Sequence, residues 1–471
     1  MYSKDLHLHF MGIGGIGMSG IAEILRLQGF VVSGCDVSKS STLTHLQEIV
    51  CITHIGHNAE HTQQADVLIY SSAVRQQHPE IQAALTKGIP VIPRAIMLAE
   101  IMRTKYSIAV SGSHGKTTTT SLVSHILIES NKKPTVIVGG VLKNIASSAQ
   151  LGKGELLIAE ADESDRSLLY LNPAMAVVTN IDAEHLDTYA DIEDIKQTFK
   201  HFLGRLPFYG KAFVCIDDPN IQAILPLPHV NTIKYGLSTK ADIMADIIAL
   251  EKNQSIFDVY ANRIGNKVFS GKKKLGRITL NIPGEHNVVN ALAATAVCLD
   301  VAISFNKIAA ALENFKGVER RFEYKGTFNG AEIFDDYGHH PTEIKKTLQV
   351  AQRRKNKKLF VAFQPHRFTR TEKLWDDFVD MFSPSYGFII DTVYITEIFP
   401  ASEDPIANIT TQKLIEAIHL KHPMIQVIHA PTYDDIVENI KTKLQEGDLL
   451  LTIGAGKVNQ VGETLVLMNK D

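Results

Sequence analysis

Residues 108–128 combine a short apolar strand at 108–110, a loop with two glycines and an apolar helical segment at 122–128. Between the apolar parts, the residues of the candidate binding motif are Gly112, Ser113, His114, Gly115, Lys116, Thr117 and Thr118. Glycines let backbone N–H groups turn toward an anion, and the first turn of a helix adds unpaired donors. The lysine supplies a positive charge and the Thr117 hydroxyl is a ligand for Mg²⁺. We therefore predict a loop that binds the phosphates of a nucleoside triphosphate.

The loop departs from the usual pattern at one position. The pattern G-x-x-x-x-G-K-[ST] has glycine where this chain has Val110, so the form present is the shorter G-x-x-G-K-T. The alternative interpretation is a tight turn that only joins a strand to a helix. The threonines at 117–120 argue against it, because β-branched residues are poor helix formers and have no stability reason to cluster there. A binding loop is the better hypothesis.

Two later apolar strands, at 156–159 and 174–178, end in residues that a metal-nucleotide site requires. Glu160 opens an acidic run that follows the first strand, and His185 lies shortly after the second. Because neighbouring parallel strands end at one edge of a sheet, these groups should converge on the phosphate loop. Mg²⁺ prefers oxygen ligands, so we predict Thr117 and Glu160 as its ligands, with His185 at a second metal position. The alternative for the acidic run is an exposed helix start.

The N-terminal segment carries a second glycine motif. A strand at 6–11 leads into Gly12, Gly14 and Gly17, a helix is predicted at 18–28, and Asp36 ends the next strand. This G-x-G-x-x-G arrangement suits a diphosphate, and the carboxylate suits a ribose. By itself the motif does not distinguish NAD from a UDP-sugar, and close strand-helix packing is a further alternative. The histidines at 54, 57, 61 and 78 lie in polar loops, and we expect most of them to be exposed.

Residues 242–282 alternate in strand fashion between turns, which predicts an antiparallel addition to the central sheet. An alanine-rich helix follows and runs to Asp300. Its start contains His286, Asn287 and Asn290, which could bind a ligand or serve only as helix caps.

From about residue 317 a third α/β unit begins. Strands at 331–335, 359–363, 388–395, 425–428 and 448–453 alternate with helical stretches, which predicts a second open sheet. Asp336 and His339 follow the first of these strands, and Arg367 and Arg370 follow the second. Two arginines three residues apart can clamp a carboxylate or a phosphate. Surface salt bridges are the alternative.

Composition sets the broad class of the protein. The 471 residues predict roughly three domains. With 48 basic and 51 acidic residues the net charge is −3, which gives nucleic-acid binding little electrostatic support. The four cysteines form neither a zinc spacing nor a disulfide framework, and there is no signal segment or run of about 18 apolar residues. We expect a cytoplasmic protein without membrane insertion.

Taken together, four segments resemble the Mur ligase family in the same order along the chain. They are residues 12–20, 112–120, 160–165 and 336–343. The resemblance also accounts for Val110, since this family uses the shortened loop. It implies an α/β protein of three domains: a Rossmann-like UDP-sugar-binding domain at 1–106, a central P-loop ATPase-like domain with an antiparallel addition at 107–316, and a Rossmann-like open-sheet domain that binds an amino acid at 317–471.

The activity implied by the resemblance is an ATP-dependent ligation in peptidoglycan precursor synthesis. L-alanine would be joined to the lactyl carboxylate of UDP-N-acetylmuramate through an acyl phosphate, with Mg²⁺ and ATP, by a monomer or weak homodimer. A sister ligase that adds a recycled peptide or another amino acid is the near alternative. An NAD-dependent dehydrogenase is the alternative from another class, but it leaves the Lys116 loop without a role.

The resemblance also implies residue roles. Lys116 and His185 would serve the reaction, together with an alanine-binding set of His339, Arg367 and Arg370. The adenine side would be formed by His286, Asn287 and Asn290, with Arg321 and Asp336 as further nucleotide contacts. The candidates for the UDP end are Gly14, Gly15, Gly17, Asp36, His57 and Ser72. Because the substrates would span three domains, we expect domain closure to gate the reaction.

Overall fold

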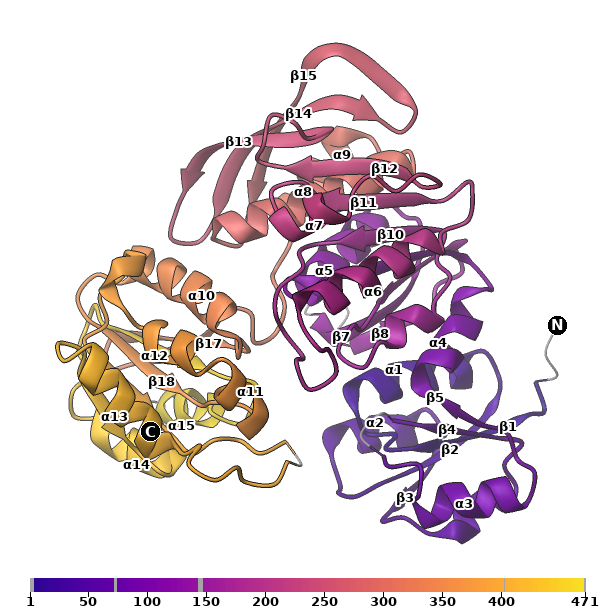
Figure 1. Cartoon of the computed structure of the whole chain (residues 1–471), viewed down its shortest axis with the longest axis horizontal. Helices are drawn as coiled ribbons and strands as arrows, with labels where there is room; N and C mark the ends of the chain where they lie inside the picture. The colour runs from indigo at the N-terminus through magenta and orange to yellow at the C-terminus, as the bar shows by residue number, and fades with distance from the viewer. Residues whose placement is uncertain (1–3, 72–73, 143–146, 402, 470–471) are drawn as a thin grey trace.

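The computed structural model describes residues 4–71, 74–142, 147–401 and 403–469, which form three lobes that follow one another along the chain (Figure 1). Each lobe is built on its own sheet with helices packed against it. The expected α/β architecture with three domains is therefore confirmed. Among the described residues, no helix is long and apolar enough to cross a membrane.

The N-terminal sheet has five parallel strands in the order β3-β2-β1-β4-β5. Its inner strands are buried on both faces, as expected for a parallel sheet covered by helices. The strands are β1 His7–Met11, β2 Val31–Asp36, β3 Ile52–Ile55, β4 Val67–Tyr70 and β5 Val91–Pro93. The helices are α1 Ile16–Leu27, α2 Ser41–Glu48, η1 Ala59–Thr62, α3 Pro79–Thr86 and α4 Arg94–Met102.

The middle sheet has ten strands in the order β15-β14-β13-β12-β11-β10-β6-β9-β7-β8. The strands are β6 Tyr106–Ser111, β7 Thr135–Leu142, β8 Ser147–Gln150, β9 Leu156–Glu160, β10 Met175–Val178, β11 Lys211–Cys215, β12 Asn231–Gly236, β13 Ile243–Leu250, β14 Ser255–Ile264 and β15 Lys267–Leu280. The last three pair antiparallel, which confirms the predicted addition. Strands β9 and β10 flank β6 in parallel, so the acidic run and His185 follow the two strands next to the phosphate loop.

The middle helices are α5 Lys116–Glu129, η2 Ser167–Tyr170, α6 Ile192–Gly204, α7 Pro219–Ile224, α8 Glu285–Asp300 and α9 Phe305–Glu313. Helix α5 begins at Lys116, six residues before the predicted apolar stretch. Its four threonines are buried in the first turns, since α5 packs between the sheet and α8 and α9. Tertiary packing therefore overrides their weak helix propensity.

The C-terminal sheet has the order β16-β17-β21-β18-β19-β20, with β16 antiparallel and the rest parallel. The strands are β16 Glu323–Phe328, β17 Ala331–Asp336, β18 Leu359–Phe363, β19 Thr392–Ile395, β20 Val427–His429 and β21 Leu449–Ile453. The helices are α10 Pro341–Arg354, α11 Phe368–Lys373, α12 Trp375–Asp380, η3 Pro384–Tyr386, α13 Thr411–Lys421, α14 Tyr433–Ile440 and α15 Asn459–Met468. Strand β19 is shorter than the predicted 388–395. Its first residue, Thr392, pairs with Phe360, and its neighbour β18 begins only one residue earlier, at Leu359.

The three domains are joined in two different ways. One apolar core runs from the N-terminal sheet into the middle sheet, and α1 packs so closely on β8 that a Cβ on Gly20 would lie 3.2 Å from the Ala149 Cβ. The C-terminal sheet has its own apolar clusters on its two faces. It meets the middle domain through polar contacts such as the Thr342 hydroxyl donating to Asp182 Oδ2 at 2.9 Å. Such an interface suits a domain that opens and closes.

Candidate active site

The predicted phosphate loop lies between β6 and α5, with both of its glycines at positive φ. A side chain on Gly112 would collide with the Thr179 hydroxyl, and a Cβ on Gly115 would lie 2.7 Å from Asn290 Oδ1. Val110 is fully buried as the penultimate residue of β6. The chain therefore reaches the loop as a regular strand, and the loop begins at Gly112.

Lys116 lies at the base of this loop. Its Nζ donates to the carbonyl oxygens of Gly112 at 2.6 Å and Ser113 at 3.1 Å, and forms an ion pair with Glu163 Oε1 at 2.6 Å. Burial lowers the pKa of Lys116, but the carboxylates of Glu163, Asp162 and Glu184 outweigh it and hold the pKa above its usual value. The lysine is therefore positively charged where a phosphate would bind.

The two predicted Mg²⁺ ligands are brought together. The Thr117 hydroxyl bonds with the Glu160 carboxylate, whose pKa is raised by burial. Glu160 Oε1 is buried and makes no hydrogen bond. An orphaned carboxylate oxygen beside a hydroxyl and a phosphate loop is a donor set that fits Mg²⁺. Together these oxygens match the predicted magnesium site.

His185 follows β10, which lies on the other side of β6 from β9 and Glu160. Its Nε2 is 3.7 Å from Glu163 Oε1 and 3.8 Å from Glu184 Oε1, and the three side chains could share one cation. Burial, together with Lys116 and Arg370, lowers the pKa of His185 to about 4, although Glu184 opposes the shift. A neutral imidazole beside two carboxylates suits a metal ligand. His185 has a positive φ of 54°, a strained conformation that often marks functional sites.

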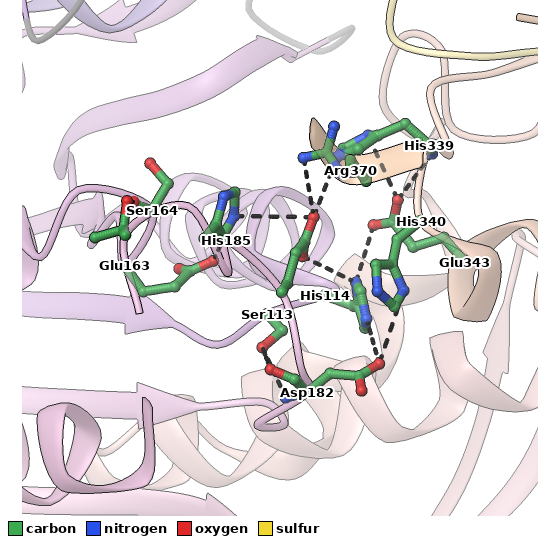
Figure 2. Close-up of polar contacts among 12 residues, drawn as sticks. Ser113, His114, Glu163, Ser164, Asp182, His185, His339, His340, Glu343 and Arg370 are labelled. Carbon is green, nitrogen blue, oxygen red and sulfur yellow. Dashed lines mark hydrogen bonds and ion pairs between the residues drawn. The ribbon is translucent and has the colours of Figure 1, made fainter. Parts of the chain in front are cut away.

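Charged side chains from the middle and C-terminal domains point toward one another around His114 (Figure 2). His114 Nε2 lies 2.9 Å from Asp182 Oδ2, and its Nδ1 lies 3.3 Å from Glu343 Oε1 of the C-terminal domain. Burial lowers the pKa of His114, but the hydrogen bond with Asp182 and the nearby Glu343 carboxylate outweigh it and raise the pKa to about 9. A protonated His114 therefore links the phosphate loop to the C-terminal domain.

The raised pKa of His114 predicts a loss of stability in alkaline solution. The folded state keeps a proton that the unfolded state, with a pKa near 6.5, releases. This proton contributes at most about 3 kcal/mol to the free energy of unfolding. The contribution is fully present below pH 6.5 and is lost as the pH rises through about 9. Thermal melts between pH 6 and about 9.5 should show a steeper fall in Tm for the wild type than for His114→Gln. Parallel Tm curves would contradict the charged state assigned to His114.

The predicted adenine residues line a cavity of about 90 Å³ beside the loop, together with Arg321 and Asp336. The N-cap of α8 is Gly284, without a side-chain cap bond, so the interpretation of His286, Asn287 and Asn290 as helix caps only is wrong. Burial raises the pKa of Asp336 to about 6, although Arg321 opposes the shift. These residues form a pocket next to the phosphate loop.

A larger cavity of about 600 Å³ lies where the three domains meet. The N-terminal domain contributes Gly15 and Gly17 to its wall, and the C-terminal domain contributes Arg321, His339 and Glu343. From the middle domain the lining includes Lys116, Thr117, Glu160, Asp162 and His185. One hollow therefore connects the N-terminal glycine motif, the phosphate loop and the C-terminal histidine.

The predicted UDP end is only partly assembled around this cavity. The Gly14 N–H donates to Asp36 Oδ2 at 2.9 Å, and the Arg94 guanidinium lies over Gly17, with Nη1 2.6 Å from where a Cβ would be. His57 instead faces Cys35. The expectation of exposed histidines is wrong, since those at 54, 57, 61 and 78 are all half-buried. Ser72 lies outside the described residues.

The two arginines of the predicted clamp are held by carboxylates of the middle domain. Arg370 Nη2 lies 3.4 Å from Glu184 Oε1, and Arg367 Nη1 lies 3.3 Å from Asp187 Oδ2. Both arginines line one small pocket between the domains, and Arg367 has a positive φ of 71°. His339 Nε2 lies 3.3 Å from the same Glu184. A substrate carboxylate would therefore compete with Glu184 and Asp187 for the guanidinium groups.

Sequence reasoning did not select four carboxylates that organise the site. Glu163 pairs with Lys116, Glu184 contacts both His339 and Arg370, and Asp182 and Glu343 hold His114 from opposite sides. Each stands inside or next to a motif that was recognised, within 160–165, 180–187 or 336–343. Burial is what distinguishes Glu163 and Glu184 from the exposed Asp165 and Asp187 in the same segments, and burial depends on the tertiary fold.

Three family models match the chain in succession. Residues 7–106 match "Mur ligase family, catalytic domain", residues 110–298 match "Mur ligase middle domain", and residues 320–456 match "Mur ligase, glutamate ligase domain".

Curated relatives match along the whole length. A UDP-N-acetylmuramate–L-alanine ligase of Desulfatibacillum aliphaticivorans is 46% identical over 470 residues, covering 99% of each chain. The protein of the same name from Geobacter sp. (strain M21) is 46% identical over 471 residues, covering 100% of this chain and 99% of the relative.

Solved structures share the fold over nearly the whole chain. The crystal structure of UDP-N-acetylmuramate-alanine ligase from Thermotoga maritima superposes with a TM-score of 0.79 at 25% identity over 99% of both chains. A murein peptide ligase from Psychrobacter arcticus, at 24% identity and a TM-score of 0.71 over 98% of both chains, shares the fold. Since family models, full-length relatives and fold all agree with the motifs, this chain belongs to the Mur ligase family.

Proposed function

We propose that this chain is an ATP-dependent ligase that joins L-alanine to the lactyl carboxylate of UDP-N-acetylmuramate, forming ADP and phosphate, in peptidoglycan precursor synthesis. The observation that carries the proposal is the cavity of about 600 Å³ in which all three domains meet around Lys116. The names of relatives that are 46% identical over nearly the whole chain support the choice of substrates.

The proposed reaction has two steps that need charge stabilisation more than covalent help from the protein. The substrate carboxylate attacks the γ-phosphate, which releases ADP and leaves an acyl phosphate. The amine of L-alanine then attacks the acyl carbon, and inorganic phosphate leaves. In this proposal Lys116 neutralises charge on the transferred phosphoryl group, because its ammonium group already lies within the loop.

Thr117 and Glu160 are proposed to hold Mg²⁺, with His185 at a second metal position. The orphaned Glu160 oxygen and the lowered pKa of His185 support this assignment. When bound, the metal supplies neutralisation of phosphate charge. Glu163, whose Oε2 is buried without a hydrogen bond, is a further candidate ligand at the second position.

The remaining assignments are proposals of the same kind. We assign binding of the UDP end to the N-terminal glycine motif and binding of adenine to the cavity beside α8. Alanine would be bound by His339, Arg367 and Arg370. We retain domain boundaries after residues 106 and 316, and propose a cytoplasmic monomer or weak homodimer. Four free, buried cysteines are consistent with a reducing compartment.

One assay separates this function from its rivals. Phosphate release from ATP should require UDP-N-acetylmuramate and should be stimulated most by L-alanine when single amino acids and tripeptides are compared. Stronger stimulation by a tripeptide would identify the sister ligase instead. The dehydrogenase interpretation explains only the N-terminal motif. It predicts that the protein binds a pyridine nucleotide and is not protected against unfolding by a UDP-sugar.

The Arg370→Ala variant tests the alanine site. We expect the KM for alanine to rise by roughly 10-fold to 100-fold, as for loss of a charge-assisted hydrogen bond, with the KM for ATP nearly unchanged. Steady-state kinetics with each substrate varied in turn would measure both constants. Arg103→Ala, at an arginine that is 60% exposed at the end of α4, is the matched control. If ATP binding collapses instead, Arg370 serves the phosphate.

A further inference from the structure

A second group of chemically active side chains lies in the N-terminal domain, outside the candidate active site. His9 comes from β1, Cys35 from β2, His61 from η1 and Glu80 from α3. One ligand atom of each lies within 4.8 Å of all the others. The side chains of His9 and Glu80 have no exposed surface, and Cys35 is equally buried.

The contacts of this group centre on the Glu80 carboxylate. His9 Nε2 lies 3.1 Å and His61 Nδ1 lies 3.5 Å from Glu80 Oε1, and Cys35 Sγ lies 3.4 Å from Oε2. A tetrahedral zinc ion with bonds of about 2.0–2.3 Å holds its ligand atoms roughly 3.3–3.8 Å apart. His57 borders the group, with Nδ1 3.0 Å from Cys35 Sγ and 3.3 Å from Glu80 Oε2. The spacing therefore matches that of a compact metal site.

A chain of hydrogen bonds sets the protonation of His9. His7 Nδ1 faces the Gln64 carbonyl oxygen at 2.9 Å and must donate to it. In a neutral His7, Nε2 then accepts from the Ser33 hydroxyl at 2.7 Å, so Ser33 Oγ accepts from His9 Nδ1 at 2.7 Å. A neutral His9 consequently turns the lone pair of Nε2 toward Glu80 Oε1. Such a contact is favourable only when a proton or a metal ion lies between the two atoms.

The same conclusion follows from the other side of the group. His61 Nδ1 is buried and makes no hydrogen bond. The ion-pair partners of Glu80 are His9, His57 and His61, which offset a buried carboxylate only when they carry a proton or share a metal ion with it. The hydrogen bond from His9 Nδ1 to Ser33 fixes the ring, and a bond of this kind at the second ring nitrogen is typical of metal-ligating histidines.

We propose that His9, Cys35, His61 and Glu80 bind one zinc ion, with His57 beside it. Two imidazole nitrogens, one thiolate and one carboxylate oxygen form a four-coordinate donor set of the kind that zinc takes in proteins. On binding, the Cys35 thiol loses its proton to solvent and the Sγ–zinc bond forms. No change of oxidation state is involved.

The proposed zinc site is coupled to the glycine motif through the backbone. The N–H groups of Gly12 and Ile13 both donate to the Cys35 carbonyl oxygen, at 2.8 and 3.1 Å. The next residue, Asp36, accepts the Gly14 N–H. Zinc would therefore stiffen the turn that carries the N-terminal glycine motif.

Metal binding by the full chain tests the proposal without any measurement of ligase activity. The purified protein is stripped with a chelator, desalted and titrated with Co²⁺ and, separately, with Zn²⁺ against a chromophoric competitor. We expect about one tightly held Zn²⁺ per chain and, with Co²⁺, a thiolate charge-transfer band with the visible bands of tetrahedral cobalt. The oxygen ligands proposed for Mg²⁺ cannot produce the thiolate band.

Three variants make the test specific. Cys35→Ser should abolish the thiolate band, whereas Cys51→Ser, at another buried cysteine of the same domain, should keep it. Ser33→Ala should keep the band and weaken zinc binding by about 10-fold to 100-fold, because it removes the hydrogen bonds of Ser33 with His9 and His7 but none of the four proposed ligands. No band in the wild type, or a band that survives in Cys35→Ser, would overturn the proposal. If Cys35→Ser fails to fold, unchanged zinc affinity in Ser33→Ala overturns it.

Discussion

Replacing Lys116 with alanine is expected to lower the rate of phosphate release at saturating substrate by at least ~10²-fold, the scale for losing one preorganised transition-state donor. The ammonium group lies within hydrogen-bond distance of two loop carbonyls, and the large cavity opens beside it. No other lysine lines that cavity among the residues the structure describes. The measurement is steady-state phosphate release with ATP, UDP-N-acetylmuramate and L-alanine.

The Lys116 variant also leaves the buried Glu163 carboxylate without its partner, so a loss of rate could reflect a loss of stability. The double variant Lys116→Ala/Glu163→Gln removes the stranded charge. We expect it to recover Tm but not rate. Lys240→Ala, at an exposed lysine of the same domain, is the control and should match the wild type. Activity within a few-fold of wild type in Lys116→Ala would remove the lysine from the mechanism.

The Glu184→Gln variant is expected to lower kcat/KM for alanine by at least ~10²-fold, equivalent to about 3 kcal/mol. Glu184 is buried between domains, with Arg370 and His339 of the C-terminal domain at 3.4 and 3.3 Å. Burial raises its pKa, but bonds with His339 and the charges of His185 and His114 hold the pKa well below its usual value. Glutamine keeps the shape of the side chain and removes its charge, so the Arg370 guanidinium loses its charged partner.

The same substitution should loosen the docking of the C-terminal domain. Small-angle X-ray scattering should then report a larger radius of gyration for Glu184→Gln than for the wild type. Glu193→Gln, at a carboxylate that is 66% exposed on α6, is the matched control and should leave both kinetics and scattering unchanged. Wild-type kinetics in Glu184→Gln would show that the carboxylate does not hold the closed arrangement.

Much of the site could be predicted from sequence because its parts are local. The phosphate loop is a run of consecutive residues whose glycines and lysine have a mechanism attached to their spacing. Glu160 and His185 could be placed beside it since parallel strands end at one sheet edge, and β9 and β10 do flank β6. The antiparallel addition could be read from alternation between turns.

Other features required the tertiary structure. The start of α5 at Lys116 was missed because packing against α8 and α9, not propensity, holds its threonines in a helix. Glu184 could not be told from its acidic neighbours, since its role depends on two side chains that are 155 and 186 residues away in the chain.

The cysteines illustrate the same limit. Their spacing indicated no metal site, yet the fold brings Cys35 against histidines and a glutamate from three other elements. The sequence by itself determined the family, the order of the domains and the phosphate loop, because these depend on neighbouring residues and on periodic patterns. Only the tertiary structure decided which carboxylates and imidazoles meet, because long-range packing and burial set both their distances and their charges.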